Sequence, residues 1–144
     1  MYVAGIDITE LTRNEVEGLH DFFVAWFRGD VPDTDDVYAR FTDATHTDFT
    51  MVVTVGQTLD RGAVLGFVRG AHASRSADFR IEIREFEARV VVADCALVTY
   101  EEWQFEGDQL LSTRTSTAYF VTDPAAPLGV SWRHLHETSH PTGV

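Results

Sequence analysis

The chain has 144 residues, of which 44% are hydrophobic and 12% aromatic, and its formal net charge is −12. This length and composition predict one globular domain over residues 1–144 and exclude an intrinsically disordered chain. The negative charge excludes nucleic acids and anionic membranes as expected partners, because both are usually bound through basic patches.

Two further features bear on where the protein works. The single cysteine, Cys95, excludes a disulfide within the chain and fits a reducing compartment. No apolar stretch reaches the length of a membrane-spanning helix, and the first residues lack the basic and apolar parts of a secretory signal. We therefore expect a cytoplasmic protein in which Cys95 is a spectator thiol.

The N-terminal third predicts two helices. Thr12–Glu15 (TRNE) matches a capping box, which would start the first helix. Gly29 and Asp30 would end it, and a shorter second helix would start near Asp33 or Thr34. The buried face of the first helix is predicted from apolar residues at three- and four-residue steps: Val16, Leu19, Phe22, Phe23, Trp26 and Phe27.

A strand and a third helix are predicted next. Residues 49–55 are apolar and β-branched, as in a strand. Asp60 can cap a helix that runs to about Ser74. Three glycines, Gly62, Gly66 and Gly70, lie on one face of this helix. Either these glycines lower the stability of the helix and the fold tolerates the loss, or a face without side chains lets the helix backbone approach the sheet closely. We favour the second interpretation.

From Phe79 onward the pattern predicts antiparallel strands at residues 79–92, 96–105, 109–122 and 131–140. In the first of these the apolar positions change parity between Arg84 and Phe86, which indicates a β-bulge. The predicted fold class is therefore α+β, with a cone-like, curved, mostly antiparallel sheet wrapped on three N-terminal helices.

This order of elements resembles the nuclear transport factor 2-like superfamily, which includes ketosteroid isomerases and SnoaL-like cyclases. The similar segments are FVAWFRGD (residues 23–30), FTDATHTDF (residues 41–49) and WRHLHE (residues 132–137). The resemblance implies a cone whose open end admits a small molecule, and a homodimer formed through the outer face of the sheet.

The resemblance to ketosteroid isomerases also implies a site. Asp48 matches the position of their general base, although the alternative that it caps the start of the strand or stays solvated carries equal weight. Phe22 occupies the position of their tyrosine, and residues 117–119 offer no carboxylic acid near the position of the second oxyanion donor. Because those donors contribute most to such catalysis, ketosteroid isomerisation itself is not expected.

Histidines could replace the missing donors. Trp132, His134 and His136 share one parity, so in a regular strand they would project from one face. We predict that they line a cavity shared with Asp48, with Asp48 and His136 as acid–base residues. The predicted ligand-binding residues are His46, Tyr100, Trp132, His134, Phe23 and Trp26.

Metal binding is the weaker alternative for these histidines. His134 and His136, together with His46 and Asp48, could supply a ligand set, but a single His-x-His pair is a weak motif. We expect neither a metal nor any other cofactor. We expect His140 to be solvated, and we give His72 a small chance of facing the cavity.

Two classes of function remain open. One is a cofactor-independent isomerase, cyclase or dehydratase acting on a small, partly apolar organic molecule. The other is a non-catalytic ligand-binding or association domain, like that of calcium/calmodulin-dependent protein kinase type II. We expect a stand-alone chain without the tethered catalytic domain that an association module would serve, so we favour the small-molecule role.

Overall fold

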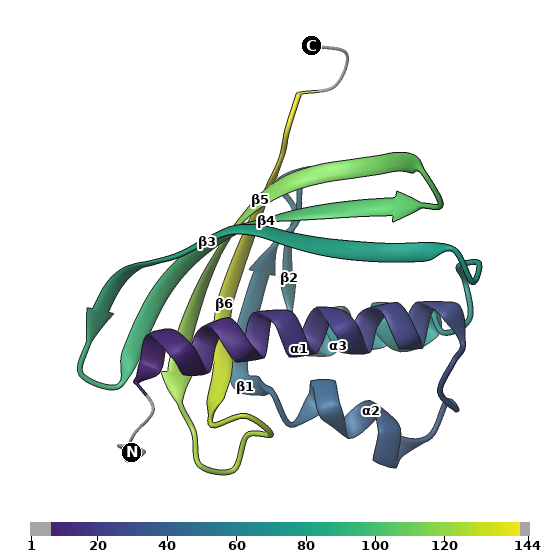
Figure 1. The fold of residues 1–144 in the computed structure, drawn as a ribbon. Helices are drawn as coiled ribbons and strands as arrows, with labels where there is room; N and C mark the ends of the chain where they lie inside the picture. The colour runs from purple at the N-terminus through teal and green to yellow at the C-terminus, as the bar shows by residue number, and fades with distance from the viewer. Residues whose placement is uncertain (1–6, 142–144) are drawn as a thin grey trace.

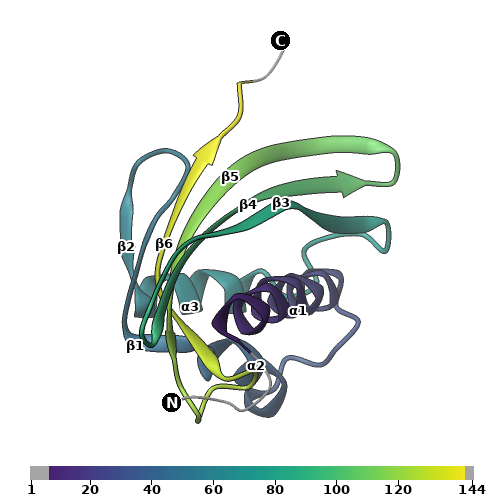
Figure 2. The same cartoon turned by 60° about the vertical axis from the view of Figure 1, so that its left-hand side comes forward.

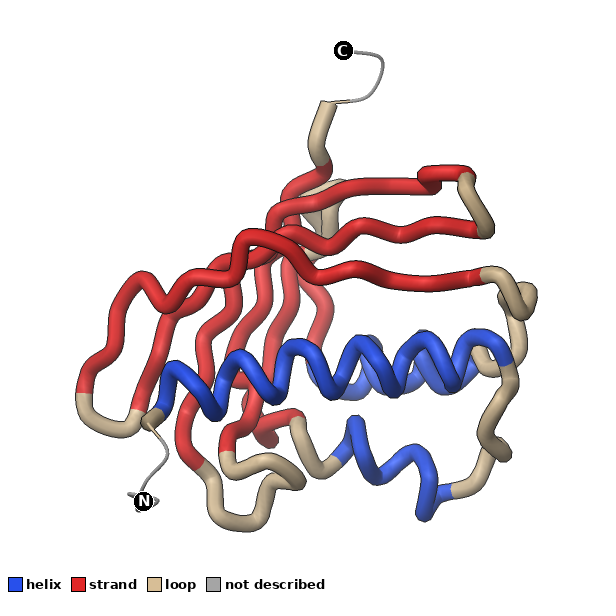
Figure 3. The backbone as a smooth tube through the Cα atoms, in the orientation of Figure 1, coloured by secondary structure: helices blue, strands red, loops and turns tan. Residues whose placement is uncertain are grey.

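The computed structural model describes residues 7–141, which form three helices and a six-stranded curved sheet (Figures 1 and 3). The elements in chain order are α1 (Ile8–Arg28), α2 (Asp35–Thr42), β1 (Thr45–Val52), β2 (Thr58–Asp60), α3 (Arg61–Gly70), β3 (Phe79–Val92), β4 (Cys95–Glu106), β5 (Gln109–Thr122) and β6 (Val130–Ser139). The predicted α+β class is confirmed. Within residues 7–141, no helix has the length and apolar character needed to cross a membrane.

The start of α1 corrects one prediction. The N-cap is Asp7, whose carboxylate accepts a hydrogen bond from the Glu10 amide at 2.9 Å, so the capping box predicted at Thr12–Glu15 is wrong. Thr12 and Glu15 are instead buried residues within the helix. The Thr12 hydroxyl donates to the Ile8 and Thr9 carbonyls instead. The predicted end is confirmed, because Gly29 adopts a left-handed conformation with φ of 77°.

The caps of the shorter helices agree with the sequence. Thr34 caps α2 and Asp60 caps α3, each by accepting a hydrogen bond from an amide three residues on. However, α3 ends at Gly70, before the predicted Ser74. A Cβ atom added to Gly66 or Gly70 would have no neighbour within 4 Å. The interpretation of a glycine face that closely approaches the sheet is therefore wrong. These glycines lower the stability of the helix, and the fold tolerates the loss.

The sheet has the strand order β2-β1-β6-β5-β4-β3. All neighbours are antiparallel except β1 and β6, which are parallel. β1 begins at Thr45, before the predicted start at residue 49, and β2 was not predicted. The sheet curves over the helices (Figure 2), with α1 packed against β3, β4 and β6 and α3 packed against β1 and β2.

Two bulges determine which side chains face the helices. In β3 the pairing with β4 shifts between Arg84 and Glu87, and Glu85 has φ of 56°, so the predicted bulge is confirmed. A second bulge lies in β6. Trp132 pairs with Phe120 and His134 pairs with Tyr119, which leaves Arg133 as the extra residue. Beyond Arg133 the inward and outward positions of β6 are exchanged.

Candidate functional site

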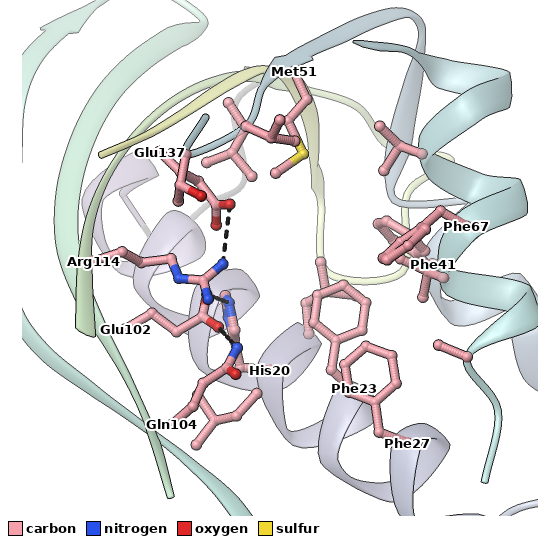
Figure 4. A pocket seen from close by; sticks show the side chains of 18 of the residues that line it. His20, Phe23, Phe27, Phe41, Met51, Phe67, Glu102, Gln104, Arg114 and Glu137 are labelled. Carbon is pink, nitrogen blue, oxygen red and sulfur yellow. Dashed lines mark hydrogen bonds and ion pairs between the residues drawn. The ribbon is translucent and has the colours of Figure 1, made fainter. Parts of the chain in front are cut away.

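The concave face of the sheet and the three helices enclose a cavity of about 560 Å³. Most of its wall is aromatic or aliphatic, and Figure 4 shows Phe23, Phe27, Phe41 and Phe67 together on one side. This volume is in the range of pockets that bind small organic molecules. The remaining apolar lining consists of Leu19, Phe49, Met51, Val53, Leu59, Val64, Val68, Ala71, Phe79, Ile81, Trp132 and Leu135.

Polar side chains gather on the opposite side of the cavity (Figure 4). They come from one helix and three adjacent strands, because inward positions alternate along each strand. β4 contributes three alternate residues to the lining, and all three are polar. The polar residues gathered here are His20 on α1, Tyr100, Glu102 and Gln104 on β4, Arg114 on β5 and Glu137 on β6, and the remaining polar lining residues are Thr54, Ser74 and Arg75.

His20 and Glu102 form a buried ion pair, with 3.1 Å between His20 Nε2 and Glu102 Oε1. His20 Nδ1 lies 2.7 Å from the Val16 carbonyl, which can only accept, so Nδ1 carries a hydrogen. Burial alone would lower the pKa of His20, but the Glu102 carboxylate raises it overall. Burial opposes ionisation of Glu102 as well, yet His20 and Arg114 hold the pKa of that carboxyl at about 2.

The second carboxyl of the cluster, Glu137, has a different environment. Its Oε1 accepts a hydrogen bond from Arg114 Nη1 at 3.2 Å. Burial and the nearby Glu102 carboxylate nevertheless raise the pKa of Glu137, although Arg114 opposes them. Glu102, by contrast, also accepts a hydrogen bond from Gln104 Nε2 at 2.6 Å. The cavity therefore holds one carboxyl that is firmly ionised and one that binds its proton more tightly than usual.

At this end the buried Arg114 Nε has no hydrogen-bond partner among the described residues, and the Tyr100 and Ser116 hydroxyls interact with each other without a well-formed hydrogen bond. Tyr100 and Ser116 are directly opposite each other on β4 and β5. Burial raises the pKa of Tyr100 well above its usual range, so its hydroxyl stays protonated and can donate. Buried polar atoms are normally satisfied, so these unpaired donors indicate where a ligand could bind.

A third buried carboxyl group, that of Glu15, supports the wall of the cavity. Glu15 Oε2 accepts hydrogen bonds from Trp132 Nε1 at 2.9 Å and from Arg40 Nη1 at 3.1 Å. Burial raises the pKa of Glu15, and Arg40 opposes that change. A Cβ at Gly18 would lie 3.1 Å from Arg40 Nη2, so the glycine leaves room for the arginine. These contacts hold the Trp132 ring in place.

The structure brings three of the predicted ligand-binding residues to the cavity: Phe23, Tyr100 and Trp132. Trp26 is not among the lining residues. It is fully buried, and its Nε1 donates to the Val68 carbonyl at 2.9 Å. His72 packs edge-on against Trp26 and bonds to the Val31 carbonyl, so it does not line the cavity either.

The predicted acid–base pair lies elsewhere. Asp48 and His136 are both exposed, and neither lines the cavity. His134 is bonded to Thr50 at 2.8 Å, and His46 Nδ1 accepts from the Asp48 amide at 3.0 Å. The expectation that His134 and His136 share a cavity with Asp48 is therefore wrong. The physical reason is the bulge at Arg133, which turns Leu135 and Glu137 inward and the histidines outward.

The sequence did contain a signal for part of the actual cluster. His20 interrupts the apolar stripe of α1, and Glu102 and Arg114 continue the inward parity of Tyr100 and Ser116. Glu137 could not be found in this way, because its inward position depends on the bulge in β6. Within residues 7–141, no group of three or more histidine, cysteine or acidic side chains is arranged to hold a metal ion.

Comparison with solved structures supports the fold. An NTF-2 like protein of unknown function from Pseudomonas aeruginosa is 28% identical, with a TM-score of 0.80, and the match covers 91% of this chain and 99% of that one. The CaMKII hub of S. rosetta matches at 16% identity and a TM-score of 0.70, over 95% of this chain and 100% of the hub. A proposed ketosteroid isomerase from Shewanella frigidimarina matches at 11% identity and a TM-score of 0.63, over 89% and 94%.

These neighbours confirm the predicted nuclear transport factor 2-like fold. A family model adds a more specific relationship. The model that describes the C-terminal part of sucrose-6-phosphate phosphohydrolase matches residues 13–141, from the second turn of α1 to the end of β6 and beyond. Because this match covers most of the chain, the protein belongs to the sucrose-6-phosphate phosphohydrolase C-terminal family.

Proposed function

We propose that the cavity binds a small, largely apolar organic molecule that carries one polar group. One observation supports this proposal above all others: an apolar cavity of about 560 Å³ ends in a buried cluster with unpaired hydrogen-bond donors. An apolar body would bury carbon surface against the phenylalanines, while the polar group would satisfy Arg114 and Tyr100.

The cluster also contains groups that could transfer protons. Burial and the Glu102 carboxylate raise the pKa of Glu137, and a carboxyl that holds its proton more tightly than usual can act as a general acid or base. Tyr100 can donate a hydrogen bond to a developing oxyanion. We propose these two side chains, in place of Asp48 and His136, as the acid–base residues of any isomerase or dehydratase activity.

The family name mentions sucrose 6-phosphate, which we propose as a comparison ligand rather than the natural one. A disaccharide phosphate carries many hydroxyl groups, and each would need a partner when buried. Most of the cavity wall is carbon and cannot provide these partners. We expect sucrose 6-phosphate to bind much more weakly than an apolar ring compound of similar size.

Fluorescence titration with the neutral dye Nile red tests the proposed binding site. Ala71 lines the cavity, so Ala71→Trp should fill part of it and weaken dye binding. Ala125→Trp is the matched control, because Ala125 is exposed in the loop before β6. Native mass spectrometry of the purified protein should in addition reveal a retained small molecule. Equal dye binding by wild type and both variants would contradict the proposal.

Self-association is a second candidate function, and a specific surface favours it. Trp103 and Phe105 alternate with the inward residues of β4, so they lie on the outer face of the sheet. Their rings stack with centroids 6.4 Å apart, and Arg84 and Arg80 lie over them. Aromatic and arginine side chains are enriched in protein interfaces. We propose a homodimer through this face, which sedimentation at micromolar concentration would test.

A further inference from the structure

The charges that line the cavity differ from those of the whole protein. The chain carries 23 acidic and 11 basic residues, with six histidines besides. The cavity lining, however, contains only two carboxyls, Glu102 and Glu137, against Arg114, Arg75 and His20. Arg75 is exposed, and no carboxylate of residues 7–141 forms an ion pair with it. Because the lining of the cavity does not share the negative charge of the whole protein, the cavity is suited to an anion.

The hydrogen bonds at the polar end also favour an acceptor as ligand. Both oxygens of Glu102 are already engaged, one by His20 and the other by Gln104. Arg114 donates to Glu137 and to Ser112, which leaves its buried Nε without a partner. The Tyr100 hydroxyl faces that of Ser116 and forms no well-formed hydrogen bond either. The firmly ionised Glu102 thus has no oxygen left for a cation, Arg114 Nε can only donate, and Glu137 Oε2 is an acceptor that becomes a donor when Glu137 is protonated.

We propose that the ligand is an amphipathic carboxylic acid, with its carboxylate bound by Arg114 and Tyr100 and its ring system packed against the phenylalanine wall. This inference rests on the proposed function and specifies the ligand class for the same cavity. A guanidinium matches a carboxylate well, because it can donate two parallel hydrogen bonds to the two oxygens.

Glu137 should respond to such a ligand. The charged or titratable groups that face it are Glu102 and Tyr100 on β4, Arg114 on β5 and His20 on α1, while Met51 on β1 carries no charge. A bound carboxylate adds negative charge beside Glu137 and competes with it for Arg114. Glu137 should therefore take up a proton when the ligand binds, and its hydroxyl then becomes a further donor.

Three probes that share one naphthalene ring and differ in the charge of the attached group test the ligand class. They are naphthoate, the neutral naphthamide and the cationic naphthylmethylammonium, titrated calorimetrically into the full chain at pH 7. We expect naphthoate to bind about tenfold or more tightly than the amide, and the cation to bind least. Titrations in two buffers of different ionisation enthalpy should show proton uptake for naphthoate but not for the amide, and Glu137→Gln should abolish this uptake.

Arg114→Gln should remove the preference for naphthoate, whereas the control Arg133→Gln, at the bulge on β6, should keep it. The wild-type comparison needs no variant, so a folding defect in Arg114→Gln cannot obscure the result. Equal binding of acid and amide would refute the inference and leave the proposed function intact. Binding of Nile red but of none of the three probes would also refute it. If Nile red does not bind either, the proposed function fails.

Discussion

His20 on α1 and Glu102 on β4 face each other at 3.1 Å, although 82 positions separate them in the chain. Only 6% and 7% of their side-chain surfaces are exposed. The ion pair fastens the long helix to the concave face of the sheet, and it also forms one end of the cavity. The same contact therefore contributes to the stability of the fold and to the chemistry of the site.

Glu102→Gln should destabilise the protein by about 3–5 kcal/mol, because it leaves a buried imidazolium without its counter-ion. Glu101→Gln is a matched control on the neighbouring outward position, where the side chain is half-buried and accepts a hydrogen bond from Trp103. We expect the control to cost about 1 kcal/mol or less. Urea unfolding at pH 7 measures both changes, and similar losses for the two variants would contradict the role of the pair.

Stability should depend on pH through the same two residues. Glu102 has a lowered pKa of about 2, so its contribution is present above the unfolded value of 4.5 and is lost as pH falls toward 2. His20 has a raised pKa, so its contribution is complete below 6.5 and is lost as pH rises through the folded value. The difference in unfolding free energy between wild type and Glu102→Gln should thus be largest between these limits. A difference that does not change from pH 3 to pH 9 would be inconsistent with this account.

Tyr100→Phe should weaken ligand binding and leave the stability of the protein nearly unchanged. The buried hydroxyl faces that of Ser116 without a well-formed hydrogen bond, so its removal should change the unfolding free energy by less than about 1 kcal/mol, or should stabilise the protein slightly. The same change should weaken naphthoate binding several-fold, because one donor to the carboxylate is lost. Thermal unfolding and calorimetric titration of one preparation measure the two effects. A large loss of stability with unchanged affinity would show that the hydroxyl has a structural role instead.

Two glycines should respond to alanine in opposite directions. Gly66 lies inside α3 with open space around it, so Gly66→Ala should stabilise the protein by up to about 1 kcal/mol. Gly29 has φ of 77°, and its added Cβ would lie 2.8 Å from Ala73 Cβ, so Gly29→Ala should be destabilising by more than about 1 kcal/mol. Urea midpoints that move in the same direction for both variants would count against the described backbone.

Trp103→Glu should convert the proposed dimer to a monomer, since it places a buried charge in the centre of the outer-face contact. The matched control is Gln109→Glu, an exposed position at the β4–β5 turn, which should leave the dimer intact. Sedimentation velocity distinguishes the two species. A wild-type protein that sediments as a monomer at micromolar concentration would refute the dimer without affecting the cavity.

Much of this fold could be predicted because its strands alternate regularly. The parity switch near Glu85 was visible in the sequence, since apolar residues lie on both sides of it, at Ile83 and Phe86. Asp60 and Thr34 were recognisable as N-caps, and each side chain accepts a hydrogen bond from the amide three residues on. The TRNE segment had the same local pattern, but tertiary contacts decide the outcome there: Glu15 bonds to Arg40 and Trp132 instead of capping the helix.

The site was harder to predict than the fold. Its location depends on one extra residue in β6, Arg133, which exchanges the inward and outward positions of the residues that follow it. The predicted histidines therefore lie outside, and Leu135 and Glu137 lie inside. The pairing register between strands that are distant in the chain decides which side chains of β6 point inward. The alternation of residues along the sequence does not reveal that register.

A crystal structure of the protein grown with naphthoate tests the central claim most directly. The account predicts density for the ring system between the phenylalanines and the sheet, with the carboxylate at Arg114 and Tyr100. An empty cavity, or a ligand bound on the outer side of the sheet near Asp48 and His136, would contradict it.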